Sequence, residues 1–147
     1  MTPEVNIIAI AVAALVPNVV GAIYYGPLLG STWRTAIGKS EADLKPKSEA
    51  LVYGGALLLS ALVAFFLNFM IGMSHKDIGA SGELVFVSPR TFGHGAFHGM
   101  AIGLMMISPI VACLGLFHGY KGKAIIINVV YWVICLAVMG GIVDMWP

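Results

Sequence analysis

Four long apolar stretches run along the chain, and shorter polar segments separate them. Each stretch is about as long as the roughly 20 apolar residues that a helix needs to cross the hydrocarbon core of a bilayer. Lipid offers no partner for backbone N–H and C=O groups, so a spanning segment satisfies them internally as a helix. The pattern therefore predicts four transmembrane helices, over residues 5–25, 49–73, 93–118 and 123–146.

The composition supports this interpretation. Hydrophobic residues make up 59% of the chain and charged residues only 10%, and the mean hydropathy is +0.93. A soluble domain carries roughly a quarter charged residues, which it needs to cover a surface that faces water. We therefore expect an all-α integral membrane four-helix bundle, a single domain over residues 1–147, with the lipid bilayer as its main partner. A net charge of +1 gives no case for a nucleic acid partner.

A short amphipathic segment lies between the first two predicted spans. In GPLLGSTWRTAIG the charged Arg34 lies off an apolar stripe with near-helical spacing, which consists of Leu28, Leu29, Trp33 and Ile37. This pattern predicts a short interfacial helix that lies on one leaflet. Ser48 and Thr91 precede the second and third spans and are typical helix caps.

The basic residues are distributed unequally between the two ends of the predicted bundle. Two of them, Lys76 and Arg90, lie between the second and third spans, whereas six lie in the other two loops: Arg34, Lys39, Lys45, Lys47, Lys121 and Lys123. Loops rich in Lys and Arg stay in the cytoplasm. We therefore expect both termini and the start of the third span to face outward.

Small residues recur in the third span, where Gly95, Gly99 and Gly103 are spaced four apart. Such a stripe lets a second helix backbone approach closely. The sequence alone does not separate packing within the bundle from packing between copies. We expect the chain to self-associate as a homo-oligomer.

The motif HGAFHG, at the start of the third span, places His94 and His98 four residues apart. Residues with this spacing share one helix face. Two imidazoles on one face can chelate a Zn²⁺ or Cu²⁺ ion, and Asp144 at the same end of the fourth span is a candidate third ligand. The alternative is a packing pair that hydrogen-bonds to its neighbours. We favour the packing pair, because short HxxxH spacings arise by chance.

Further polar residues inside the spans form two predicted layers. Polar side chains are costly in a membrane, so each has either a packing partner or a function. Asn6 and Asn68 lie at the outer depth, near His94, His98 and Asp144, whereas Asn18 and Asn128 lie in the inner half. We interpret the inner pair as side chains that hydrogen-bond between helices.

Three motifs together resemble a known family: VPNVVGAIYYGPLLGSTW, TFGHGAFHG and INVVYWVICLAVMGGI. The chain resembles the bacterial membrane proteins grouped as domain of unknown function 1761, over nearly its whole length. The resemblance implies four transmembrane helices and a bacterial cytoplasmic (inner) membrane, and it implies no activity. The two histidines of the family motif match His94 and His98. The first family motif often ends in Trp-Tyr, where this chain has Tyr24 and Tyr25.

No phosphate-binding loop, nucleophile elbow, dinucleotide-binding glycine pattern or zinc-protease motif is present in the sequence. We therefore favour a non-enzymatic, self-associating helical module with an outward-facing His/Asp polar site. Two alternatives use the same residues, His94, His98 and Asp144. One is a metal- or proton-linked protein of transport or sensing, and the other is a membrane enzyme that acts on a lipid or quinone.

Overall fold

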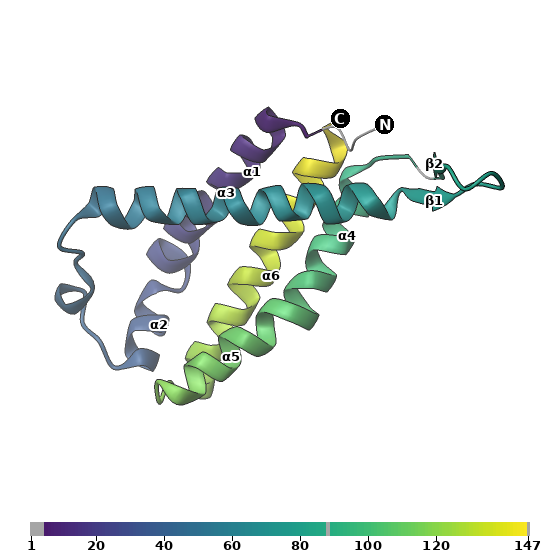
Figure 1. Ribbon diagram of the computed structural model, residues 1–147. Coiled ribbons are helices and arrows are strands. Elements are labelled where there is room, and N and C mark those ends of the chain that lie inside the picture. The colour runs from purple at the N-terminus through teal and green to yellow at the C-terminus, as the bar shows by residue number, and fades with distance from the viewer. Residues whose placement is uncertain (1–4, 88, 147) are drawn as a thin grey trace.

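The computed structural model describes residues 5–87 and 89–146 and contains four long apolar helical segments (Figure 1). Their bounds are Ile7–Leu28, Glu49–Ser74, Phe92–Phe117 and Gly122–Met145. Each is long and apolar enough to cross a membrane. The predicted all-α architecture with four spans is confirmed, and the ends of the spans differ from the prediction by only a few residues.

Two of the four segments are interrupted helices. The first consists of α1 (Ile7–Ile23) and a π-helical stretch (Tyr24–Leu28). The third consists of α4 (Phe92–Ile102), a π-helical stretch (Gly103–Ile107) and α5 (Ser108–Phe117). The second and fourth segments are the continuous helices α3 (Glu49–Ser74) and α6 (Gly122–Met145).

The connections contain small elements of their own. The short helix α2 (Gly30–Ile37) and one 3₁₀ turn (Ala42–Leu44) lie between the first two segments. An antiparallel hairpin follows α3 and consists of β1 (Lys76–Ile78) and β2 (Leu84–Phe86), in which Asp77 pairs with Val85. We call the end of the molecule that carries this hairpin the hairpin end, and the opposite end, with α2 and the turn before α6, the loop end (Figure 1).

Side-chain caps fix where three of the helices begin. The side-chain oxygens of Asn6, Ser48 and Thr91 accept hydrogen bonds from backbone N–H groups in the first turns of α1, α3 and α4. Such caps satisfy N–H groups that have no partner inside the helix. The predicted caps at Ser48 and Thr91 are confirmed, and Thr91 sets the start of the helix that carries His94.

Helix α6 contacts every other long helix, and its closest partner is α4. Glycines allow this approach: a Cβ atom on Gly99 would overlap the backbone of Leu136, and one on Gly95 would overlap Gly140 and Asp144. The predicted glycine stripe thus packs within the bundle. Helix α3 crosses in front of the other long segments (Figure 1), and buried side chains fill the space between α3 and α6, among them Leu67, Ile71, Leu136 and Met139.

Helix α2 is attached to the loop end of α6. The Trp33 Nε1–H and the Tyr25 hydroxyl both donate to Oδ1 of Asn128, at 2.8 Å each. Asn128 thus joins α6 to the π-helical stretch and to α2. The short amphipathic helix predicted from the sequence is present, and its place at a membrane surface remains a prediction.

Candidate functional site

A cluster of polar side chains lies at the hairpin end, where three helix ends meet. His75 is the residue at which α3 ends, His94 lies in the first turn of α4, and Asp144 lies in the last turn of α6. We call these three residues the His/Asp cluster. The absence of a side chain on Gly95 brings α4 against Asp144, and the positive end of the α4 dipole favours a carboxylate there.

The carboxylate of Asp144 is the centre of the His/Asp cluster. Its Oδ1 lies 2.6 Å from His75 Nε2, and its Oδ2 lies 2.9 Å from His94 Nδ1. His75 is 0% and Asp144 2% exposed, whereas the side chain of His94 is 26% exposed. A buried carboxylate is costly unless donors or a positive charge compensate it, and the two imidazoles supply this compensation, one at each carboxylate oxygen.

The third histidine of this end, His98, lies beside the cluster. Its ring centroid is 4.5 Å from that of His94, which in turn is 4.2 Å from that of His75. The shared helix face that the spacing predicts is therefore present. The three groups whose ligand atoms converge are His75, His94 and Asp144, however, and His98 is not among them.

The donor set of the cluster is suited to a transition metal. One potential ligand atom from each of the three residues lies within 4.8 Å of the other two. Imidazole nitrogen and carboxylate oxygen bind Zn²⁺ and related divalent ions, and three protein ligands leave a fourth position for water or another ligand. Without an ion, the same groups form a hydrogen-bonded His–Asp–His chain.

Sequence reasoning did not include His75 in the candidate site. No spacing motif connects it to His94, which lies beyond the hairpin, or to Asp144, which lies on the last helix. One signal was available in the sequence: His75 directly follows the second apolar stretch, at the same predicted membrane face as His94 and Asp144. A buried imidazole at that depth needs a polar partner.

The other predicted polar residues have separate places. Asn6 caps α1, and its side-chain nitrogen lies 3.4 Å from the backbone oxygen of Trp146. Asn68 is buried on α3, and Asn18 lines a groove between α1, α3 and α6. Asn128 hydrogen-bonds between elements, as expected.

Comparisons with known proteins place the chain in a family without assigning it an activity. Neither the curated proteins nor the solved structures contain a match. A family model described as "Protein of unknown function (DUF1761)" matches residues 8–143. This range includes His75 and His94, and Asp144 is the residue directly after it. The chain therefore belongs to the DUF1761 family, as the three sequence motifs indicated.

Proposed function

We propose that this protein is a non-enzymatic membrane protein that binds one divalent transition-metal ion, Zn²⁺ or Cu²⁺, at the His/Asp cluster. The observation that supports the proposal most strongly is the convergence of three ligand atoms from three helices on one point. His75 and Asp144 are buried there and held by contacts at 2.6 and 2.9 Å. The proposed ligands are His75, His94 and Asp144.

The third side chain changes the balance between packing and metal binding. The spacing of His94 and His98 alone favoured a packing pair. His75 adds a second imidazole from the end of a different helix, beside His94 and in contact with the other oxygen of the same carboxylate. A ligand nitrogen carries no proton, so a bound ion would replace the hydrogen bonds between the imidazoles and Asp144. The ion would then hold three helix ends together.

Elemental analysis of the purified protein tests the proposal. The full chain is purified in a neutral detergent, exposed to Zn²⁺ or Cu²⁺, and freed of excess ion by gel filtration. We expect about one ion per chain for the unaltered protein. His75→Ala and Asp144→Asn remove a ligand, so metal retention should fall at least tenfold, as expected when one of three ligands is lost.

His118→Ala is the matched control. His118 lies at the loop end and its Nδ1 contacts the Leu114 carbonyl of its own helix at 2.6 Å, so its loss should leave metal retention unchanged. His98→Ala should also retain the ion. Circular dichroism verifies that each variant is folded. The proposal would be contradicted if His75→Ala and His118→Ala lost the bound metal to the same extent. It would also be contradicted if the folded, unaltered chain retained neither Zn²⁺ nor Cu²⁺.

The membrane setting extends the proposal. We propose that the chain lies in a bacterial inner membrane with both termini and the His/Asp cluster on the outer side, because the loop end carries six of the eight basic residues.

Self-association remains a prediction, which the mass of the detergent-solubilised particle tests. It is supported by the exposed apolar surface of α3, where Gly54 and Gly55 face open space. Transport, sensing and lipid or quinone chemistry have no additional support from the described residues.

A further inference from the structure

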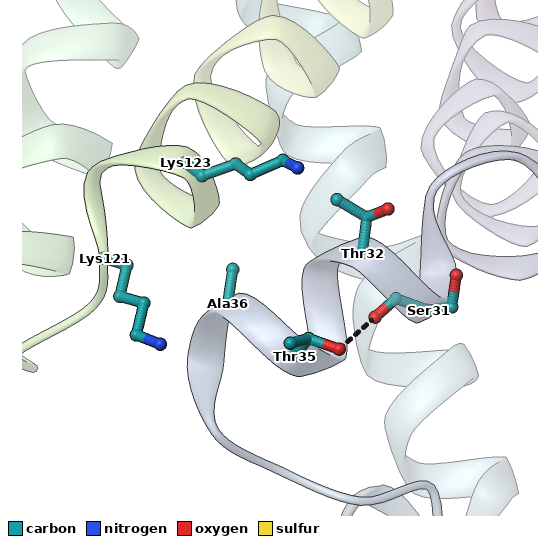
Figure 2. A pocket seen from close by; sticks show the side chains of 6 residues that line it. All are labelled: Ser31, Thr32, Thr35, Ala36, Lys121 and Lys123. Carbon is teal, nitrogen blue, oxygen red and sulfur yellow. Dashed lines mark hydrogen bonds between the residues drawn. The ribbon is translucent and has the colours of Figure 1, made fainter.

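An open pocket lies at the loop end, far along α6 from the His/Asp cluster. It measures about 390 Å³ and lies between α2 and the start of α6. Figure 2 shows two lysine side chains on the α6 side and four small side chains on the α2 side. We call this cavity the lysine pocket, and its lining residues are Ser31, Thr32, Thr35, Ala36, Lys121 and Lys123.

The lysine pocket has an uncompensated positive charge. Lys121 and Lys123 lie two residues apart, and none of the residues that line the pocket is acidic. Neither lysine takes part in an ion pair described for residues 5–87 and 89–146, whereas Arg34 on α2 is paired with Glu41 at 3.8 Å. Two like charges at one cavity repel each other, so an anion between them would be stabilised.

Hydrogen-bond donors for an anion surround the same space. Ser31 and Thr32 line the pocket with hydroxyl groups that can donate to an anion, whereas the Thr35 hydroxyl donates to the Ser31 carbonyl at 2.9 Å. Helix α6 begins at Gly122, and its N-cap residue, Lys121, makes no side-chain capping bond. The positive dipole end of this long helix adds to the charge of the lysines.

We propose that the lysine pocket binds a phosphate group. Ammonium groups, hydroxyls and free helix N–H groups are the donors that proteins use for phosphate. The pocket lies where two membrane segments end, so the phosphate of an anionic phospholipid headgroup is within reach, and basic pockets at helix ends bind such headgroups. Free inorganic phosphate presents the same chemistry. The proposal is independent of the metal site.

Two binding measurements on the full chain in neutral detergent test the proposal. In one arm, native mass spectrometry compares retention of phosphatidylglycerol with retention of zwitterionic phosphatidylcholine. The other measures binding of radiolabelled inorganic phosphate at constant ionic strength. The variant is Lys121→Gln with Lys123→Gln, which removes both charges and leaves polar side chains. The matched control is Lys45→Gln with Lys47→Gln, which removes two charges with the same spacing in residues that do not line the pocket.

We expect the pocket variant to lose about tenfold in phosphatidylglycerol retention, because each lysine near an anionic lipid contributes on the order of a few-fold in affinity. The control should change by less than about twofold. Selective loss in the lipid arm identifies a headgroup, and selective loss only in the phosphate arm identifies free phosphate. Equal loss in the two double variants, or no loss in either arm, would overturn the proposal.

Discussion

Two side chains of α6 each form hydrogen bonds with two other segments of the chain. Asp144 contacts His75 and His94 at the hairpin end, and Asn128 accepts from a tyrosine and a tryptophan at the loop end. In each case one planar group joins three separate elements. Because an unpaired polar group is costly away from water, both residues restrict which neighbours can pack against α6. Through these two residues, α6 helps to fix the positions of the elements that pack against it.

Asn128 offers a test of this role. Asn128→Ala leaves the Tyr25 hydroxyl and the Trp33 Nε1–H without their acceptor. We expect a loss of about 1–2 kcal/mol in the free energy of unfolding, since each hydrogen bond between membrane helices contributes roughly 0.6–1 kcal/mol. Tyr25→Phe removes one of the two bonds and should cost about half as much. Denaturant unfolding in detergent, followed by circular dichroism, measures both.

Tyr53→Phe is the control variant for Tyr25→Phe, because it removes a tyrosine hydroxyl from an exposed position. Tyr53 is exposed on α3, so its hydroxyl loss should change the unfolding free energy by less than about 0.5 kcal/mol. If Asn128→Ala unfolds at the same denaturant concentration as the unaltered chain, Asn128 does not hold α2 in place.

The difference between His94 and His75 shows what a sequence reveals about single residues. His94 was identified because helical periodicity relates it to His98, and this relation is local. The contact of His75 with Asp144 joins residues 69 positions apart in the chain. It depends on where α3 crosses α6, and no local pattern encodes that crossing. The candidate site was therefore only partly predictable.

At the level of elements, the contact between α4 and α6 depends on glycine. The Cβ atom of an alanine at position 99 would overlap the Leu136 carbonyl, and one at position 140 would overlap the Gly95 carbonyl. Backbone lies against backbone here, so neither helix can yield by a change of rotamer. Since α4 carries His94 and α6 carries Asp144, this contact also sets the geometry of the His/Asp cluster.

Gly99→Ala should therefore separate the two helices. We expect a loss of roughly 1–3 kcal/mol in the free energy of unfolding, typical of overpacking in a tight interface. Metal retention should fall together with stability, because His94 and Asp144 move apart. Thermal unfolding in detergent and elemental analysis measure the two effects.

Gly93→Ala is the control on the same helix. A Cβ atom on Gly93 meets nothing within 4 Å, and alanine favours a helix over glycine by up to about 1 kcal/mol. This variant should be as stable as the unaltered chain or slightly more so. A Gly99→Ala protein that unfolds at the same temperature as Gly93→Ala would show that the close contact is unimportant.

The elements that local sequence patterns determine were predicted well. Apolar length predicted the four spans, and amphipathic spacing predicted α2. The π-helical stretches and the hairpin were not predicted. In Tyr24–Leu28, Gly26 departs from helical dihedral angles, and Pro27 follows it directly. The sequence shows both residues but not the hydrogen bonds that the Tyr24 and Tyr25 hydroxyls make to α6, which are contacts between distant parts of the chain.

For the whole molecule, the structure places the start of α1 beside the end of α6. The Asn6 side chain lies 3.4 Å from the Trp146 carbonyl oxygen, and α1 begins near the end of α6 at the hairpin end (Figure 1). The proposed metal site is thus at the same end as the start of α1 and the end of α6, and the lysine pocket is at the opposite end. With six basic residues at the loop end and two at the hairpin end, the charge asymmetry predicts which end faces the cytoplasm.

Reporter fusions in bacteria test this orientation. Alkaline phosphatase is active only after export, so a fusion after the end of α6 should be active, whereas a fusion in the Lys45–Lys47 loop should be inactive. Green fluorescent protein at the same two positions should give the opposite result. Because the positive-inside effect depends on the basic residues themselves, replacement of Lys39, Lys45 and Lys47 by Gln should weaken the preference. A fluorescent fusion after α6 would place the His/Asp cluster on the cytoplasmic side, where its ion would come from the cytoplasmic pool.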